Sequence, residues 1–173
     1  MPIDKKTMTT RLAAIKVLVV DDEPYTRKVV RALLANIGVH DVYDAPDGSA
    51  GLEMIRTVVP DVIILDWEMP GLDGPKFARM VRLPEAFPNP DVPIIMLTGH
   101  GERSRMIQAM NFGVDEFLLK PVSSRALQDR LISVLVKSHE LVQGGEAAGQ
   151  ARRKMATSRA DGDAAIANLT LLN

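Results

Sequence analysis

The chain has 173 residues, which is enough for one domain of ordinary size with tails and too few for two full domains joined by a linker. Apolar residues make up 46% of the sequence and charged residues 25%, close to the average for soluble globular proteins, so wholesale disorder and fibrous repeats are excluded. The formal net charge of -1 argues against a protein built around broad contact with nucleic-acid phosphates.

Cysteine is absent, which excludes disulfide scaffolds, thiol catalysis and Cys-ligated zinc, and which fits a reducing compartment. The longest apolar runs span only a few residues, and the start of the chain forms no apolar signal-type stretch. We therefore expect a cytoplasmic protein without membrane insertion.

Short β-branched runs alternate with longer stretches of helical periodicity, a pattern typical of βα units on a parallel sheet. Three of the runs are almost entirely apolar, as central strands must be when helices cover both faces of the sheet. The sequence thus predicts an α/β fold with a five-stranded, doubly wound parallel sheet. The expected strands are residues 16–20, 41–44, 62–65, 93–97 and 116–119.

Helical periodicity predicts helices at residues 24–37, 47–58, 74–83, 102–112 and 123–139. The first begins at Pro24, which is tolerated in a first turn, and ends at Gly38. Asp47 is a suitable N-cap for the second helix, which we expect to turn Val59 inward with its other apolar residues. Four prolines in residues 84–93 predict a stiff, irregular connection.

These elements place one domain at residues 15–141, after an N-terminal extension at 1–14 and before a C-terminal tail at 142–173. The tail is rich in alanine and polar residues, so we expect it to be flexible and too short to hold an output domain. Its apolar residues Ile166, Leu169 and Leu172 follow a spacing of three, which leaves open a short amphipathic helix that docks on a partner or on the domain.

Acidic residues follow two of the expected strands at the point where each strand ends. Asp21, Asp22 and Glu23 come directly after the first strand, and Asp66 comes directly after the third. Open α/β sheets bind ligands at the carboxyl ends of their strands, and the first and third strand ends are neighbours if the second strand lies at an edge. Carboxylates that converge there repel one another unless a cation lies among them, and oxygen ligands of this kind suit Mg²⁺.

The ends of the fourth and fifth expected strands add a hydroxyl and a positive charge, Thr98 and Lys120. Together with a metal ion, these groups form a pocket for a tetrahedral anion carried covalently on an aspartate. A phosphoryl group on Asp66 would have its oxygens met by Mg²⁺, Lys120 and Thr98. Each residue taken alone is typical of a turn, a cap or a solvated position, and it is the joint pattern that favours this chemistry.

At these residues the sequence resembles the receiver domain of bacterial two-component response regulators, in particular the single-domain type to which the chemotaxis regulator belongs. The resemblance covers about residues 16–141. Its motifs are Val-Leu-Val-Val-Asp-Asp-Glu-Pro at 17–24, Asp-Val-Ile-Ile-Leu-Asp-Trp-Glu-Met-Pro-Gly-Leu-Asp-Gly at 61–74, Pro-Ile-Ile-Met-Leu-Thr-Gly at 93–99 and Phe-Leu-Leu-Lys-Pro at 117–121.

The resemblance implies a flavodoxin-like sheet with strand order 2-1-3-4-5 and the transfer of a phosphoryl group to Asp66 from a sensor histidine kinase or a histidine phosphotransfer protein. It also implies a magnesium site, in which Asp22 is a direct ligand, Asp21 acts mainly through metal-bound water, and Glu68 supplies its backbone carbonyl. Lys120 would pair with the phosphoryl group.

By the same resemblance, Thr98 is the switch hydroxyl and Phe117 the aromatic switch residue, and the bond between Lys120 and Pro121 is cis. Two positions tune the lifetime of the phosphoryl group in this family, and Glu68 and His100 occupy them here. His100 could steer the attacking water or cap the helix expected at 102–112, and the sequence leaves both roles open.

We therefore expect a stand-alone response regulator that is a phospho-acceptor protein rather than an enzyme, with magnesium-dependent self-phosphorylation and autodephosphorylation. Its fourth and fifth expected helices, at 102–112 and 123–139, would form the face that binds a downstream effector protein, without contact to DNA. The chain could act as an effector or as a phosphorelay intermediate.

Three other functions are compatible with an α/β sheet of this kind. A haloacid-dehalogenase-type phosphatase requires a second aspartate two residues after the nucleophile, where this chain has Glu68. A flavodoxin-like electron carrier would have to hold a flavin phosphate after the first strand, where this chain is acidic. A receiver module that binds proteins without phosphorylation is the remaining alternative.

Overall fold

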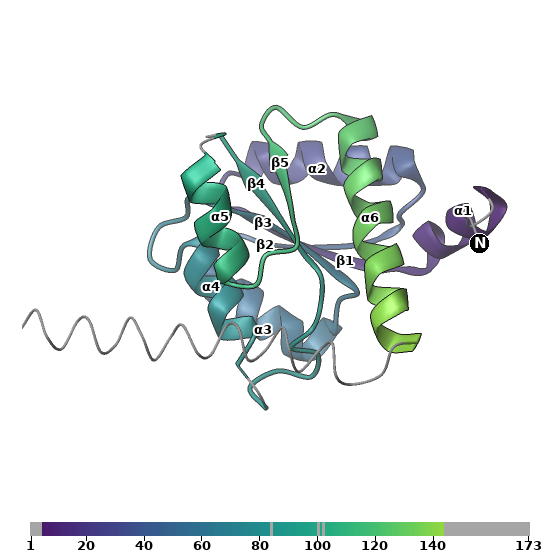
Figure 1. Ribbon diagram of the computed structural model, residues 1–173. Coiled ribbons are helices and arrows are strands. Elements are labelled where there is room, and N and C mark those ends of the chain that lie inside the picture. Colours follow the sequence, from purple (N-terminus) through teal and green to yellow (C-terminus); the bar gives the residue numbers. More distant parts are fainter. Residues whose placement is uncertain (1–4, 84, 100, 102, 144–173) are drawn as a thin grey trace, which may run out of the picture.

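The computed structural model describes residues 5–83, 85–99, 101 and 103–143, which form alternating strands and helices (Figure 1). The strands are β1 (Lys16–Val20), β2 (Asp41–Ala45), β3 (Val62–Asp66), β4 (Ile94–Thr98) and β5 (Glu116–Leu119). The helices are α1 (Lys5–Ala14), α2 (Pro24–Ile37), α3 (Gly48–Val58), α4 (Gly74–Val81), α5 (Arg103–Asn111) and α6 (Ser124–Gln143).

All neighbouring strands pair in parallel, in the order β2-β1-β3-β4-β5. This confirms the expected flavodoxin-like α/β fold and places β2 at an edge. The chain order reverses at β1, so the next strand in the sheet on one side is β2 and on the other side β3. Ligands of doubly wound sheets bind at such a switch point, beyond the carboxyl ends of the strands.

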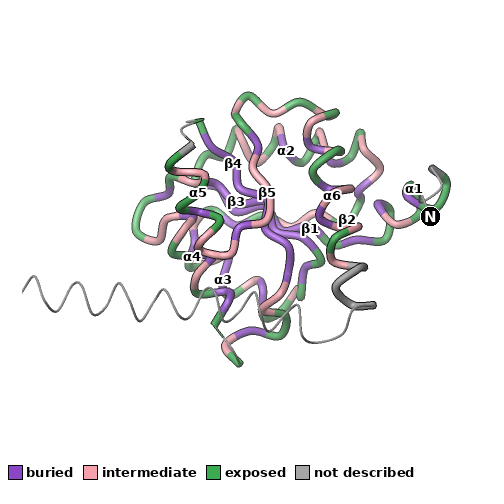
Figure 2. Tube along the Cα trace, in the orientation of Figure 1, coloured by how far each residue is buried: buried purple, intermediate pink, exposed green. Residues whose placement is uncertain are grey.

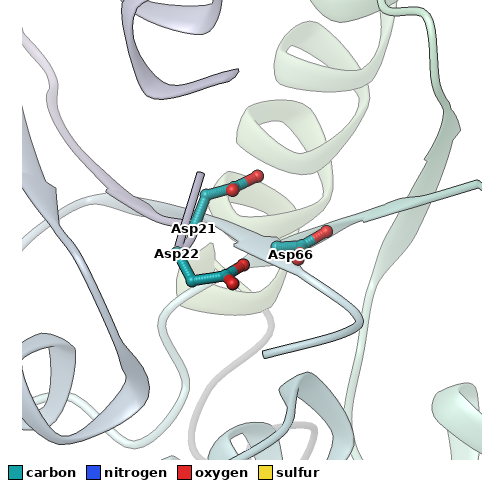
Figure 3. A group of neighbouring side chains, drawn as sticks. All are labelled: Asp21, Asp22 and Asp66. Carbon is teal, nitrogen blue, oxygen red and sulfur yellow. The ribbon is translucent and has the colours of Figure 1, made fainter. Parts of the chain in front are cut away.

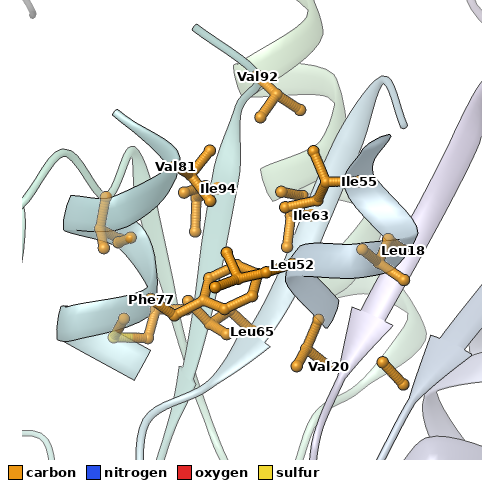
Figure 4. Packing of buried hydrophobic residues seen from close by; sticks show 14 of the residues in the cluster. Leu18, Val20, Leu52, Ile55, Ile63, Leu65, Phe77, Val81, Val92 and Ile94 are labelled. Atoms are coloured by element: carbon orange, nitrogen blue, oxygen red, sulfur yellow. The ribbon is translucent and has the colours of Figure 1, made fainter. Parts of the chain in front are cut away.

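The residues of each strand alternate between two apolar clusters, one on each face of the sheet, as the period of two along a strand requires. On one face, Leu18, Ile63 and Ile94 pack against α3, α4 and α5 (Figure 4). On the other face, Val17 and Ile64 pack against α1, α2 and α6. The buried segments therefore lie along the sheet, and exposed segments form the outer surfaces of the helices (Figure 2).

Helix α1 is an element that the sequence pattern did not indicate in the N-terminal extension. Met8 and Leu12 lie one helical turn apart on its inner side and are buried in the cluster that also contains Val39 and Val62. Two apolar contacts in ten residues give no amphipathic signal, because the rest of α1 combines small and polar side chains. Helix α1 extends the core beyond the start of β1.

Local signals explain several element ends. Asp47 accepts a hydrogen bond from the Ala50 amide at 2.8 Å and so caps α3 as predicted. Gly38 ends α2 with a left-handed φ of 96°. The expectation that Val59 points inward is wrong: α3 ends at Val58, and Val59 adopts a φ of 51° with 43% of its surface exposed, because Pro60 prevents the helix from continuing.

The described part of the chain contains no helix that is both long and apolar enough to cross a membrane. Helix α6 continues to Gln143, and the rest of the tail expected at 142–173 lies outside the described residues.

Candidate functional site

Three carboxylates meet at the switch point of the sheet. Asp21 and Asp22 follow β1, and Asp66 is the last residue of β3, so parallel pairing of these strands brings them to one edge. Their nearest oxygen atoms all lie within 4.8 Å of one another, and Figure 3 shows the side chains extending to the same side. Asp21 and Asp66 are buried, whereas Asp22 is exposed. The predicted convergence of these acids is confirmed.

Lys120 reaches into this cluster from the end of β5. Its Nζ atom lies 2.8 Å from Asp66 Oδ1 and 3.3 Å from Asp21 Oδ2. The lysine is held in place by the sheet, because its backbone amide donates to the carbonyl of Thr98 at 2.9 Å. Lys120 is joined to Pro121 by a cis peptide bond, as expected.

The acids and the lysine shift one another's proton affinity. Burial raises the pKa of Asp66 from its ordinary value of 3.8 to about 6, and the charges of Asp21 and Asp22 act in the same direction, against the hydrogen bond and charge of Lys120. Burial alone would lower the pKa of Lys120, but its contacts with Asp66 and Asp21 outweigh this effect and raise it. Lys120 is therefore positively charged at neutral pH. Asp66 is ionised there only at a cost in free energy to the folded protein.

These groups line a pocket of about 450 Å³. The other lining residues come from the turns that follow β1, β3 and β4: Glu23, Trp67, Glu68 and Gly99. Thr98 is buried at the end of β4 and is not among the lining residues, and Phe117 lies half-buried against the core cluster of α3, α4 and α5. His100 lies outside the described residues.

Glu68 occupies the rim of the pocket, with its side chain 63% exposed. Arg105 of α5 lies 3.4 Å from its Oε1 atom, which connects the rim of the pocket to α5. The sequence did not indicate Arg105 as a site residue, because a contact between a turn and a helix nearly forty positions later depends on the packing of the helices.

Arg27 of α2 is a second residue near the site that the sequence reading missed. Its Nη1 atom donates to the backbone carbonyl of Asp21 at 2.8 Å, and its Nε atom donates to Asp44 of β2 at 3.2 Å. One signal was present in the sequence: Arg27 lies one helical turn after the acidic residues 21–23, on the helix that follows them.

The donor set fits a hard divalent cation such as Mg²⁺. Asp21, Asp22 and Asp66 offer only oxygen ligands, in a pocket with room for retained water, and no softer histidine or cysteine ligand belongs to this group. A cation among these carboxylates would also relieve the repulsion that contributes to the raised pKa of Asp66.

This structure belongs to the class of doubly wound α/β proteins that have an acidic pocket at the switch point of the sheet. Within that class, the profile of the response regulator receiver domain matches residues 17–132, about two thirds of the sequence. The chain belongs to the response regulator receiver family and thus to two-component signalling.

Chemotaxis regulators and transcriptional regulators are both among the similar proteins. Chemotaxis protein CheY-3 of Vibrio cholerae is 31% identical over 68% of this chain and 88% of its own length. The phosphate regulon transcriptional regulatory protein PhoB of Pseudomonas aeruginosa is 37% identical over 69% of this chain, but the match spans only 51% of PhoB. This chain thus spans about half the length of the transcriptional regulators it matches.

Solved structures agree with this assignment. Chemotaxis protein CheY4 of Vibrio cholerae matches 69% of this chain and 98% of its own, with a TM-score of 0.63 and 32% identity. The Francisella response regulator 1452 receiver domain matches 72% of this chain and 98% of its own, with a TM-score of 0.64 and 31% identity.

Proposed function

We propose that this receiver domain accepts a phosphoryl group on Asp66 from the phosphohistidine of a sensor histidine kinase or a histidine phosphotransfer protein. The observation that carries the proposal is the bridging position of Lys120, between Asp66 and Asp21 in an open acidic pocket. An aspartate in a turn needs no such arrangement, whereas a nucleophile for phosphoryl transfer needs nearby positive charge to stabilise the transferred group.

In this reaction, a carboxylate oxygen of Asp66 attacks the phosphorus atom, the phosphorus–nitrogen bond breaks, and its electron pair leaves with the imidazole of the donor. Lys120 holds Oδ1 of Asp66 before the transfer and is in place to pair with a phosphoryl oxygen afterwards. A bound Mg²⁺ would be held by Asp21, Asp22, Asp66 and the carbonyl of Glu68, and would offset negative charge on the acids and the phosphoryl group.

The same groups would support self-phosphorylation by small phosphodonors and the later hydrolysis of the acyl phosphate. We assign Glu68 a role in setting the lifetime of that phosphate, because its exposed carboxylate lies at the rim of the pocket. The corresponding role of His100 remains a hypothesis from the family resemblance.

Output would run through a protein surface on α5, β5 and α6. Thr98 would move toward the phosphoryl oxygens, and Phe117 would turn into the space it leaves. Two residues on α5, Ile107 and Met110, have 52% and 58% of their surface exposed, and such side chains suit contact with a partner. We place this activity in the cytoplasm, in a receiver unit that spans residues 15–141.

Fluorescence of Trp67 tests the proposal, because this residue follows Asp66, lines the pocket, and is the one tryptophan in the sequence. Addition of Mg²⁺ and then beryllofluoride should change its emission in two steps. Acetyl phosphate should add one phosphoryl group to the intact protein, as measured by mass spectrometry.

Asp66→Asn should keep the fold and lose both the beryllofluoride response and the phosphoryl mass. A folded wild-type protein that responds to neither ligand contradicts the proposal and favours a protein-binding receiver that works without phosphorylation.

A further inference from the structure

Every polar group of Asp21 has a partner in the structure. Its amide donates to the carbonyl of Ala45 at 3.3 Å, its Oδ1 atom accepts from the amide of Glu23 at 2.8 Å, and its Oδ2 atom faces Lys120. The remaining group is the carbonyl, which accepts from the guanidinium of Arg27 at 2.8 Å. Asp21 is completely buried, so each of these contacts replaces water that the residue lacks.

The contact with Arg27 has a consequence for the next residue. A peptide unit is planar, so the carbonyl of Asp21 lies in one plane with the amide nitrogen and the Cα atom of Asp22. A donor that fixes this carbonyl therefore fixes the direction in which Asp22 leaves the strand. Asp22 is the exposed member of the acid cluster, and it has the least packing of its own to hold it.

Arg27 is itself held from the far side. Its guanidinium donates to Asp44 on the edge strand β2, and its side chain is only 16% exposed. A planar guanidinium can donate to the two acceptors at once in a fixed geometry, which a lysine ammonium does less well. The guanidinium thus ties the turn after β1 to β2.

We infer that Arg27 is a positioning residue for the metal site: through the carbonyl of Asp21, it holds the Asp21–Asp22 turn in the arrangement that binds a divalent cation. The inference rests on the proposed function, because it concerns the ion which that function requires. Groups that orient metal ligands typically contribute tenfold or more to affinity, although they do not touch the ion.

The direction in which Mg²⁺ affinity changes when Arg27 is replaced shows whether Arg27 acts by positioning the turn or only through its charge. Arg27 is a cation close to an acidic site, so removal of its charge alone should make Mg²⁺ bind more tightly. Loss of its positioning contact should make Mg²⁺ bind more weakly. We expect Arg27→Met to weaken Mg²⁺ binding by about tenfold, measured by titration calorimetry and by the fluorescence of Trp67.

Two further variants make the comparison strict. Arg27→Met combined with Asp44→Asn restores the net charge of the wild type, and we expect it to remain as weak as Arg27→Met alone. Arg31→Met is the matched control: Arg31 lies on the same helix and also pairs with Asp44, but its other hydrogen bond goes to the carbonyl of Val42 at 2.9 Å. We expect Arg31→Met to bind Mg²⁺ as tightly as the wild type or slightly more tightly.

Circular dichroism and thermal unfolding establish that each variant is folded. If Arg27→Met does not fold, Arg27→Gln is used in its place, and the same loss of Mg²⁺ affinity is expected. Affinity equal to or above that of the wild type in the Arg27 variant overturns the inference. An equal loss in Arg31→Met also overturns it, because the effect would then belong to α2 as a whole. If the wild-type protein binds no Mg²⁺, the metal site of the proposed function is wrong, and the inference about Arg27 is wrong with it. This result differs from the two above, in which the wild type binds Mg²⁺ and only the role of Arg27 is overturned.

Discussion

The substitution Asp66→Asn should make the metal-free protein more stable at neutral pH while it removes the proposed phosphorylation site. Burial and the neighbouring acids raise the pKa of Asp66 from 3.8 to about 6. This shift of about two pKa units corresponds to about 3 kcal/mol of free energy that opposes ionisation in the folded state. Asparagine is similar in size and carries no charge, so the cost disappears.

The pH dependence follows from the same shift. The pKa of Asp66 is higher in the folded state than in the unfolded state, so the folded protein binds more protons between about pH 4 and pH 6. The contribution of Asp66 to the free energy of unfolding is therefore greatest below this window, falls as the pH rises through it, and stays low above pH 6. Asp66→Asn should lack this component.

Urea unfolding in the presence of a chelator, at pH values below and above the window, measures the difference directly. We expect Asp66→Asn to raise the free energy of unfolding by about 1 to 3 kcal/mol above pH 6 and to have little effect near pH 4. Glu53→Gln, at an exposed position of α3, is the control and should change little at either pH. The reasoning is contradicted if Asp66→Asn is less stable than the wild type at neutral pH, or if it changes the free energy of unfolding by the same amount at both pH values.

Three further substitutions test how the fold supports the site. Leu12→Ala in α1 removes a side chain that is 1% exposed and should lower the free energy of unfolding by about 2 to 5 kcal/mol in urea. Gly74→Ala would place a methyl group 2.5 Å from the carbonyl oxygen of Asp66, so it should weaken Mg²⁺ binding in calorimetry. Arg82→Met removes a buried guanidinium that pairs with Asp115 and should cost about 3 to 5 kcal/mol in the same unfolding assay.

The sheet and the acid cluster were predictable from the sequence because both depend on strand ends. An apolar run followed directly by Asp66 fixes where the strand stops and which edge the carboxylate reaches, and parallel pairing brings that edge beside Asp21. The same reasoning placed Lys120 at the end of β5. These predictions needed only the short apolar runs, the residues that follow each run, and the position of the second strand at an edge of the sheet.

Contacts that depend on the reach of a long side chain were not predictable in this way. Arg82 is fully buried and donates to the carbonyls of Gly113 and Pro90, although an arginine at the end of a helix is usually solvated. Its burial explains how the proline-rich connection before β4 is held, which the sequence indicated only as stiff. The role of Arg27 was hidden for the same reason, since its acceptor is a backbone carbonyl that no residue type reveals.

The pocket and the core place opposite demands on the chain. Three carboxylates within 4.8 Å of one another destabilise the metal-free fold, and they stay together because the strands that carry them are fixed by apolar clusters on both faces of the sheet. Replacement of Asp66 should therefore increase stability, and replacement of Leu12 in the core should decrease it. A cation that enters the pocket relieves part of this repulsion, so its binding stabilises the fold through the pocket rather than through the core.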